Sequence, residues 1–259
     1  MTEPAPALND PFAVLAGPLA GTTRMRLEVV SSQRLSPALQ RLVLTAPELA
    51  GLEYQPGQDL MLMVGVAGDR PVRRRYTIAG LDRARRLVTV DVVRHSEGPG
   101  ERWVAAAGPG DQIEGIGPRG KIFVNPAADW HLFAADESAL PAWFAMAGAL
   151  PAGARALLIL EVPSRADERE LVTAADAELT WLHRDGRPAG EPAGLVAAVT
   201  AAGLPPGRGH AYLAGEASVV LALRAALAAR GLAEEQISPK AYWGRGRANA
   251  AHGEPARDG

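Results

Sequence analysis

Three consecutive arginines stand directly before an aromatic residue in the segment RRRYTI, residues 73–78. Arginine suits a bound phosphate because its planar guanidinium group can donate to two phosphate oxygens at once. Side chains alternate between the faces of a strand, so Arg74 and Tyr76 would share one face and Thr77 would lie on the other. The segment therefore fits a strand that presents a cation and a phenol along one groove. An edge strand with solvated arginines fits equally, and the segment alone leaves both readings open.

A second group of polar residues follows an apolar run in AADESALPA, residues 134–142. The pattern predicts a strand that ends near Asp136 and a helix over residues 139–149, with Ser138 as its N-cap. The carboxyl end of a strand in an open α/β sheet is where such sheets bind ligands. AGEAS, residues 214–218, repeats the arrangement, so Gly215 and Glu216 would line the same cleft. No Gly-x-Gly-x-x-Gly pattern is present.

Glu161 ends another apolar run, LILEV. An acid at this place can accept hydrogen bonds from an adenosine ribose and would repel a 2′-phosphate, which favours NADH. Arg165 and Arg169 follow closely and could favour NADPH instead. A solvated loop of charged residues is a third possibility, so the preference stays open.

The elements that would position these groups follow two different patterns along the chain. Residues 22–124 hold short runs rich in β-forming residues with Gly, Pro and Asp between them, which is typical of an antiparallel barrel or sandwich. From residue 130 on, strand-like and helix-like runs alternate, which indicates a parallel sheet covered by helices. We predict an arm over 1–21, a β-barrel domain over 22–127, an α/β domain over 128–246 and a tail over 247–259. A helix over 218–230 would end before Gly231 as its C′ residue.

The amino-acid composition excludes several kinds of functional site. The 259 residues include 27 Lys and Arg against 29 Asp and Glu, so nothing favours nucleic acid as a general partner. The chain has no cysteine, which excludes disulfides, thiol catalysis and cysteine-ligated clusters. Its five histidines are scattered, with no close pair resembling a metal site. No leader or membrane-spanning run is visible, so we expect a cytoplasmic monomer without a metal of its own.

Several segments together resemble one protein family. Besides RRYT, residues 74–77, they are DVVRHSEGPGERWVAAAGPGD, ADESALPA, AYLAGEAS and KAYWGRGRAN, which lie in that order between residues 91 and 249. These blocks are similar to those of the siderophore-interacting proteins, a branch of the ferredoxin–NADP reductase superfamily that comprises FAD-dependent reductases of ferric siderophores. The resemblance covers residues 26–249 and is more specific than any single motif. It implies a flavin-binding β-barrel followed by a nicotinamide-binding α/β domain.

The resemblance also implies roles for particular residues. Arg74 would bind the FAD diphosphate, Tyr76 and Thr77 would flank the flavin ring, and the short helix after residue 98 would face phosphate. His95 would lie against the adenosine part, or else is an ordinary histidine at a strand end. The remaining residues expected to contact FAD are Ile78, Val93, Gly98, Pro99, Gly100 and Trp103.

On the nicotinamide side, the resemblance implies contacts to NADH or NADPH. The residues that would make them are Asp136, Glu137, Ser138, Glu161, Gly215, Glu216 and Trp243. Lys240, Arg245 and Arg247 form a local basic cluster that would attract an anionic ferric siderophore, or else a solvated basic tail. Tyr242 and Trp243 would cap the cleft or pack in a core.

Three residues depart from the family pattern: Ser96 after the histidine, Glu101 where a hydroxyl residue is usual, and Ala79 where arginine is frequent. An acid beside a phosphate is unfavourable unless it turns away. The sequence thus predicts an NAD(P)H:FAD:ferric-siderophore oxidoreductase that releases Fe(II) for iron assimilation, in which the cofactor does the redox chemistry. The alternatives are a flavin reductase with another electron acceptor and a non-catalytic protein that binds siderophore or flavin.

Overall fold

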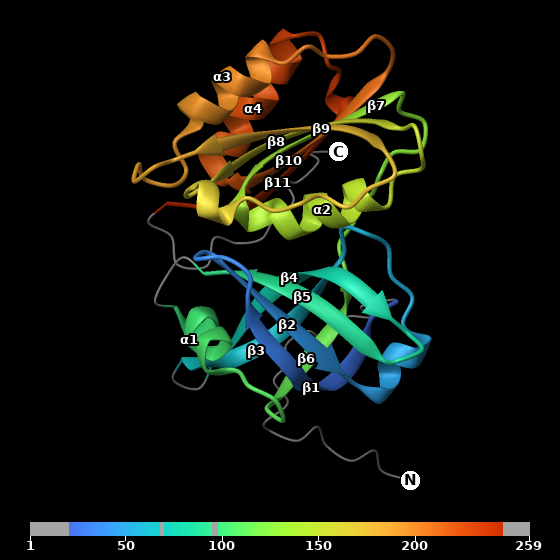
Figure 1. The fold of residues 1–259 in the computed structure, drawn as a ribbon, viewed down its shortest axis with the longest axis vertical. Coiled ribbons are helices and arrows are strands. Elements are labelled where there is room, and N and C mark those ends of the chain that lie inside the picture. Colours follow the sequence, from blue (N-terminus) through green and yellow to red (C-terminus); the bar gives the residue numbers. More distant parts are fainter. Residues whose placement is uncertain (1–20, 68–69, 95–97, 246–259) are drawn as a thin grey trace.

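The computed structural model describes residues 21–67, 70–94 and 98–245, which form a β-barrel and a parallel sheet with helices (Figure 1). The barrel is closed, with strand order β1-β2-β5-β4-β3-β6 and antiparallel neighbours throughout. Its strands are β1 (Thr23–Arg34), β2 (Leu39–Thr45), β3 (Asp59–Ala67), β4 (Arg70–Asp82), β5 (Leu87–Val93) and β6 (Gln112–Arg119). Helix α1 (Pro99–Ala106) joins β5 to β6. The prediction of an antiparallel β-barrel is confirmed.

Every second side chain of the strands points inward and fills the core of this barrel. In β1, Met25, Leu27 and Val29 are buried while the residues between them are exposed. Leucine and valine side chains from the other strands complete the core, and Val104 of α1 closes it from one end. Because every strand has a neighbour on both sides, the barrel has no open edge.

The second unit is a five-stranded parallel sheet of order β11-β10-β7-β8-β9. Its strands are β7 (Trp130–Asp136), β8 (Arg155–Val162), β9 (Asp176–His183), β10 (Gly209–Glu216) and β11 (Ile237–Trp243). Helix α2 (Leu140–Gly148) covers the face nearer the barrel, and α3 (Pro192–Ala201) and α4 (Ala217–Ala229) cover the other face (Figure 1). The predicted α/β sheet is therefore confirmed, and the residue boundaries of the predicted domains stay predictions.

Burial on both faces explains the composition of the central strands. All residues of β7 and β10 are buried, and each strand is a mostly apolar run that contains one histidine and ends in an acid. Phe133 and Tyr212 stack with their ring centroids 4.8 Å apart, on the face that Trp143 of α2 covers. Within the described ranges, no helix is long and apolar enough to cross a membrane.

The start of α2 differs from the prediction. The chain leaves β7 through a short 3-10 turn, Glu137–Ala139, and the carboxylate of Asp136 accepts from the amide of Ser138 at 2.9 Å. Asp136 is thus the cap of this turn, and the prediction that Ser138 is the N-cap is wrong. An ionised carboxylate is a stronger acceptor than a hydroxyl, and Ser138 becomes a donor to it. At α4, Gly231 has φ +90°, which confirms it as the residue that ends the helix.

Candidate cofactor and substrate site

Arg74 and Tyr76 lie side by side beneath the first turn of α1. A Cβ atom on Gly100 would come within 2.8 Å of the hydroxyl of Tyr76 and 3.1 Å of Cγ of Arg74. Both side chains therefore share the face of β4 that the helix covers, as the alternation predicts. Neither is a solvated side chain, since both are partly buried. Burial raises the pKa of Tyr76, so the phenol stays protonated and can donate a hydrogen bond.

The first turn of α1 has the features of a phosphate cradle. Gly98 precedes it with extended backbone and no side-chain cap, and Pro99 occupies the first turn. The first amides of a helix lack partners within it and carry partial positive charge. Gly100 lets this turn approach Arg74 closely. The residues present therefore fit a diphosphate held between uncapped amides and a guanidinium group.

Glu101 does not face this cradle as a free acid. Its Oε1 pairs with Nε of Arg94 at 2.6 Å, and both side chains are largely buried. Its Oε2 is buried without a hydrogen-bond partner among the described residues. The expected repulsion of phosphate is thus offset by the ion pair with Arg94. Sequence reasoning missed this role of Arg94.

The opposite face of β4 meets the parallel sheet. Arg75 forms a two-point ion pair with Asp59 of β3, at 2.8 and 2.6 Å. Nζ of Lys240 in β11 lies 3.7 Å from the same carboxylate and 5.1 Å from the ring centroid of Tyr242. Burial raises the pKa of Tyr242, and the side chain of Thr77 opposes that rise. The edge strand β11 is therefore attached through Asp59 to the strand that carries Arg74 and Tyr76.

The strand registers bring the acids of the parallel sheet together at one edge. Asp136 pairs with Glu161 across β7 and β8, and Glu216 pairs with Trp243 across β10 and β11. Both pairs lie at the carboxyl ends of their strands, as the sequence predicts. Such an edge is where a parallel sheet binds a nucleotide.

Asp136 is the centre of this edge and is almost fully buried. Besides Ser138, its carboxylate accepts from the amide of Glu216 at 3.0 Å and from the indole Nε1 of Trp243 at 2.9 Å. Burial and the charge of Glu137 raise its pKa, and the hydrogen bonds from Ser138 and Trp243 work in the opposite direction. Gly215, with φ +129°, leaves room for it, since a Cβ there would lie 2.6 Å from Oδ2.

Glu216 has the same capping role at α4. Its Oε2 accepts from the amides of Ser218 and Val219, and its Oε1 accepts from the amide of Arg245. Burial tends to raise its pKa, but these hydrogen bonds outweigh burial and hold the pKa below its usual range. A Cβ on Gly190 would lie 2.7 Å from Cγ of Glu216, so the loop after β9 packs closely on this cap. Glu216 is consequently a structural anchor at the edge of the candidate cleft.

Arg184 is the main residue of this edge that sequence reasoning missed. It is 6% exposed and follows the end of β9. Its Nη1 and Nη2 pair with the two carboxylate oxygens of Glu137 at 2.5 and 2.6 Å, and Nη1 lies 3.4 Å from Oε1 of Glu161. Burial raises the pKa of Glu161, and Arg184 opposes that rise. Its only sequence signal is an arginine directly after a predicted strand, which resembles a solvated strand end.

Other predicted site residues have ordinary structural contacts. The side chain of Ile78 is in the barrel core, and its amide donates to the carbonyl of Gln58 at 2.9 Å. Trp103 packs against the barrel core from α1, and Val93 packs against the cluster under α2. His95 and Arg247 lie outside the described residues.

Lys240 and Arg245, two members of the predicted basic cluster, contact different parts of the protein. Lys240 points to Asp59 and its side chain is 14% exposed. Arg245 instead donates through Nε and Nη2 to the carbonyl of Ala189, with Glu191 at 3.9 Å. These two cations therefore have different surroundings, and each is already engaged by the protein.

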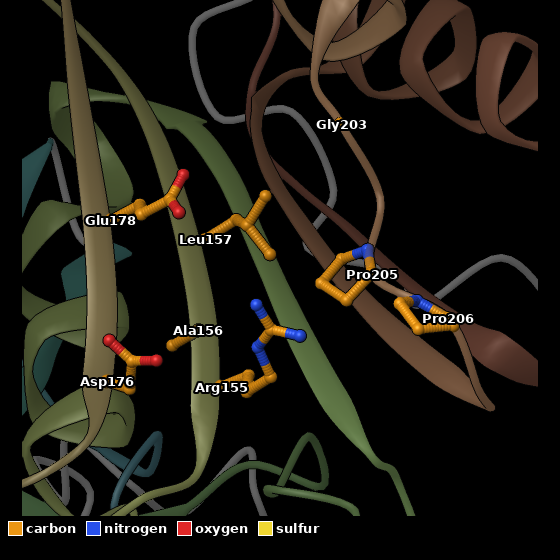
Figure 2. A pocket seen from close by; sticks show the side chains of 8 residues that line it. All are labelled: Arg155, Ala156, Leu157, Asp176, Glu178, Gly203, Pro205 and Pro206. Atoms are coloured by element: carbon orange, nitrogen blue, oxygen red, sulfur yellow. The ribbon is translucent and has the colours of Figure 1, made fainter.

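The amino edge of the same sheet offers a contrast. A hollow of about 120 Å³ lies there between the starts of β8 and β9 and the loop before β10 (Figure 2). Its lining is Arg155, Ala156, Leu157, Asp176, Glu178, Gly203, Pro205 and Pro206. Ligand pockets are usually about 300–1,000 Å³, so this hollow is too small for a dinucleotide.

Two histidines that are far apart in the sequence lie together near the amino edge. His131 and His210 are in register on β7 and β10, and the ring of Tyr212 contacts both. Burial lowers the pKa of each, and for His210 the charges of His131 and Arg208 add to that effect. In the described residues, no group of three or more His, Asp or Glu side chains could hold a metal ion.

Family models match both parts of the chain. Residues 64–122 match the siderophore-interacting FAD-binding domain, and residues 128–246 match the siderophore-interacting protein domain. Ferric vibriobactin reductase ViuB of Vibrio cholerae is 31% identical over 251 residues, covering 88% of this chain and 92% of its own. The chain belongs to the siderophore-interacting protein family. The match of the barrel to an FAD-binding domain supports FAD as the cofactor of this family member.

Further relatives agree with this assignment. An uncharacterized protein of Mycobacterium tuberculosis is 40% identical over 189 residues, or 69% of this chain and 67% of that protein. The crystal structure of a siderophore utilization protein from T. fusca is 33% identical, with a TM-score of 0.81 over 90% of this chain and 97% of that one. A ferredoxin reductase in carbazole 1,9a-dioxygenase shares the fold at 21% identity, with a TM-score of 0.69 over 87% and 71%. The two-domain fold is therefore that of the ferredoxin reductases.

Proposed function

We propose that this protein is an FAD-containing reductase that takes electrons from NADH or NADPH and reduces ferric siderophores, releasing Fe(II). The observation that carries the proposal is the ion pair of Lys240 in β11 with Asp59, whose carboxylate also pairs with Arg75 of β4. It joins the strand of the proposed flavin site to the edge strand of the proposed nucleotide site. Electron transfer between two cofactors requires them to be close, and this contact places the two strands next to each other.

On the barrel side, Arg74 and the amides of α1 would hold the diphosphate of FAD, and Tyr76 would donate a hydrogen bond from its protonated phenol. Arg94 keeps Glu101 paired, so that acid does not repel the diphosphate. When bound, FAD would accept two electrons from the nicotinamide and deliver them singly to Fe(III). The protein's part is to orient the partners and to exclude water.

On the sheet side, the carboxyl edge would receive the dinucleotide. Asp136 keeps Trp243 in place through the indole hydrogen bond, so that the ring would form a fixed wall of the proposed cleft. Glu216 holds the start of α4 and the amide of Arg245 together. These buried carboxylates act as fixed acceptors within the protein, and the chemistry does not require them to exchange protons.

The siderophore is proposed as the substrate because of the family and because a relative carries the name ferric vibriobactin reductase. Its binding face would be on the β11 side, where Lys240 and Arg245 lie. Since both side chains have internal partners, they would contribute a positive potential and not open hydrogen-bond donors. The role predicted for Arg247 remains part of this proposal.

The proposal is tested with purified protein, a ferric siderophore and a chelator that traps Fe(II). We expect the protein to be yellow, to lose its flavin absorbance on anaerobic addition of NADH or NADPH, and to yield trapped Fe(II) when the siderophore is added. Reduction of free flavin or quinone with no Fe(II) would favour another electron acceptor. Bound flavin that neither nucleotide reduces would favour a carrier.

A further inference from the structure

The buried ion pairs around Arg184 bear on the choice between NADH and NADPH, which the sequence leaves open. Enzymes that bind a 2′-phosphate hold it with free cations, most often arginine. Arg184 lies at the carboxyl edge of the sheet, but both of its Nη atoms pair with Glu137. Arg184 therefore cannot donate from both Nη atoms to a phosphate.

Two neighbouring arginines on this side use part or all of their donors on the backbone. Arg187 donates through Nε and Nη2 to the backbone carbonyls of Arg184 and His183, at 3.0 and 2.8 Å, while its Nη1 lies 3.9 Å from where a Cβ on Gly194 would be. Arg245 donates twice to the carbonyl of Ala189. The loop after β9 thus uses its guanidinium groups to hold its own backbone.

Glu161, in contrast to Arg184, has an oxygen that can still accept a hydrogen bond. It is 5% exposed, Arg184 reaches only its Oε1, and no described residue donates a hydrogen bond to its Oε2. That oxygen lies 3.8 Å from where a Cβ on Gly194 would be, in the first turn of α3. A ribose 2′-hydroxyl could donate to it, whereas a 2′-phosphate would meet a buried carboxylate.

We propose that Glu161, held by Arg184, is the residue that selects NADH over NADPH. This inference rests on the proposed function, because it concerns the nucleotide of the same reaction. Arg184 is a positioning residue, since it fixes Glu161 and Glu137 without a free face for the ligand. Three cations would act against this selection: Arg165, exposed in the short turn after β8, Arg169, and Arg187 through its Nη1.

The inference can be tested by binding, independently of turnover. ADP-ribose and 2′-phospho-ADP-ribose differ only by the phosphate in question, and calorimetry on the FAD-loaded protein gives the affinity of each. We expect ADP-ribose to bind at least about tenfold more tightly, since like charges brought together at an interface cost several kcal/mol. NADH should likewise reduce the bound flavin at lower concentration than NADPH.

Two variants of Glu161 and one control variant test whether Glu161 is the residue that distinguishes NADH from NADPH. Glu161→Gln removes the charge and should bring the two affinities to within about threefold, while Glu161→Asp keeps the charge and should keep the preference. Glu178→Gln is the matched control, because Glu178 is exposed at the amino edge of the sheet (Figure 2). It should leave both affinities unchanged.

Equal or tighter binding of the phosphorylated fragment by the unmodified protein would overturn the inference, and so would a preference that persists in Glu161→Gln. Either result leaves the proposed reductase intact as long as one nucleotide bleaches the flavin. If neither nucleotide reduces bound FAD, the proposed function itself fails, and the inference falls with it.

Discussion

Nζ of Lys240 in β11 lies 3.7 Å from the carboxylate of Asp59 in β3, and this ion pair ties the β-barrel to the parallel sheet. Lys240→Met removes the cation and leaves the buried carboxylate of Asp59 paired with Arg75. We expect a loss of about 1 kcal/mol in the free energy of unfolding, measured by denaturant titration. Lys121→Met is the control, because Lys121 is exposed. Equal stability of the two variants would show that the ion pair does not hold the domains together.

Gly100 decides how closely α1 approaches the proposed phosphate cradle. In Gly100→Ala, the new Cβ would lie 2.8 Å from the hydroxyl of Tyr76, so Tyr76 and Arg74 must shift. Overpacking of this kind costs about 1–3 kcal/mol, and we expect FAD affinity to fall about tenfold or more. Fluorescence titration of the apoprotein with FAD measures it.

Gly108→Ala is the matched control, because a Cβ on Gly108 meets no atom within 4 Å. It should bind FAD as the unmodified protein does. If Gly100→Ala also kept full affinity, FAD would not depend on the contact between α1 and β4.

Gly215 is required by the buried carboxylate of Asp136. In Gly215→Ala, the Cβ would come within 2.6 Å of Oδ2, at a φ of +129° that L residues rarely adopt. We expect a loss of about 2 kcal/mol or more in the free energy of unfolding. Gly203→Ala, where a Cβ meets no atom within 4 Å, should change stability by less than about 0.5 kcal/mol. A stable Gly215→Ala variant would contradict the close packing of this edge.

The pair His131 and His210 predicts a loss of stability in mild acid. Burial lowers both pKa values in the folded protein, so below about pH 6.5 the unfolded chain binds more protons. The free energy of unfolding should therefore fall as the pH drops from 7 toward 5, with a slope of up to about 1.4 kcal/mol per pH unit for each histidine. Asp136 and Glu161 have raised pKa values and contribute with the opposite sign above their unfolded pKa values, so the histidine variants are needed to separate the two effects.

Denaturant titrations between pH 8 and pH 5 measure this slope. His131→Gln and His210→Gln should each reduce it, and the double variant should reduce it further. A slope that stays the same in the double variant would assign the acid sensitivity to other groups.

Much of the fold follows from local patterns. The barrel strands alternate clearly, and the runs that form β7, β8 and β10 are apolar enough to be recognised as buried strands. Two elements were not predicted, each for a physical reason. Helix α3 contains a glycine and is apolar almost all round, so it has no clear helical periodicity. Strand β11 contains Pro239, a residue that argues against a strand unless the strand lies at the edge of the sheet.

The candidate site could be predicted only in part. Arg74, Asp136 and Glu216 stand at strand positions or strand ends that sequence can locate. The clamp of Arg184 on Glu137 and the pairing of His131 with His210 depend on strand order and register, which join residues 47 and 79 positions apart. Periodicity within one segment carries no information about such contacts.

Electrons should pass from a nicotinamide through bound FAD to the iron of a siderophore. Anaerobic rapid mixing, followed by the flavin absorbance, measures each of these steps. We expect NADH to bleach the flavin and a ferric siderophore then to restore the colour, with two Fe(II) trapped for each NADH consumed. Flavin that stays reduced in the presence of the siderophore, or protein that binds no FAD, would contradict it.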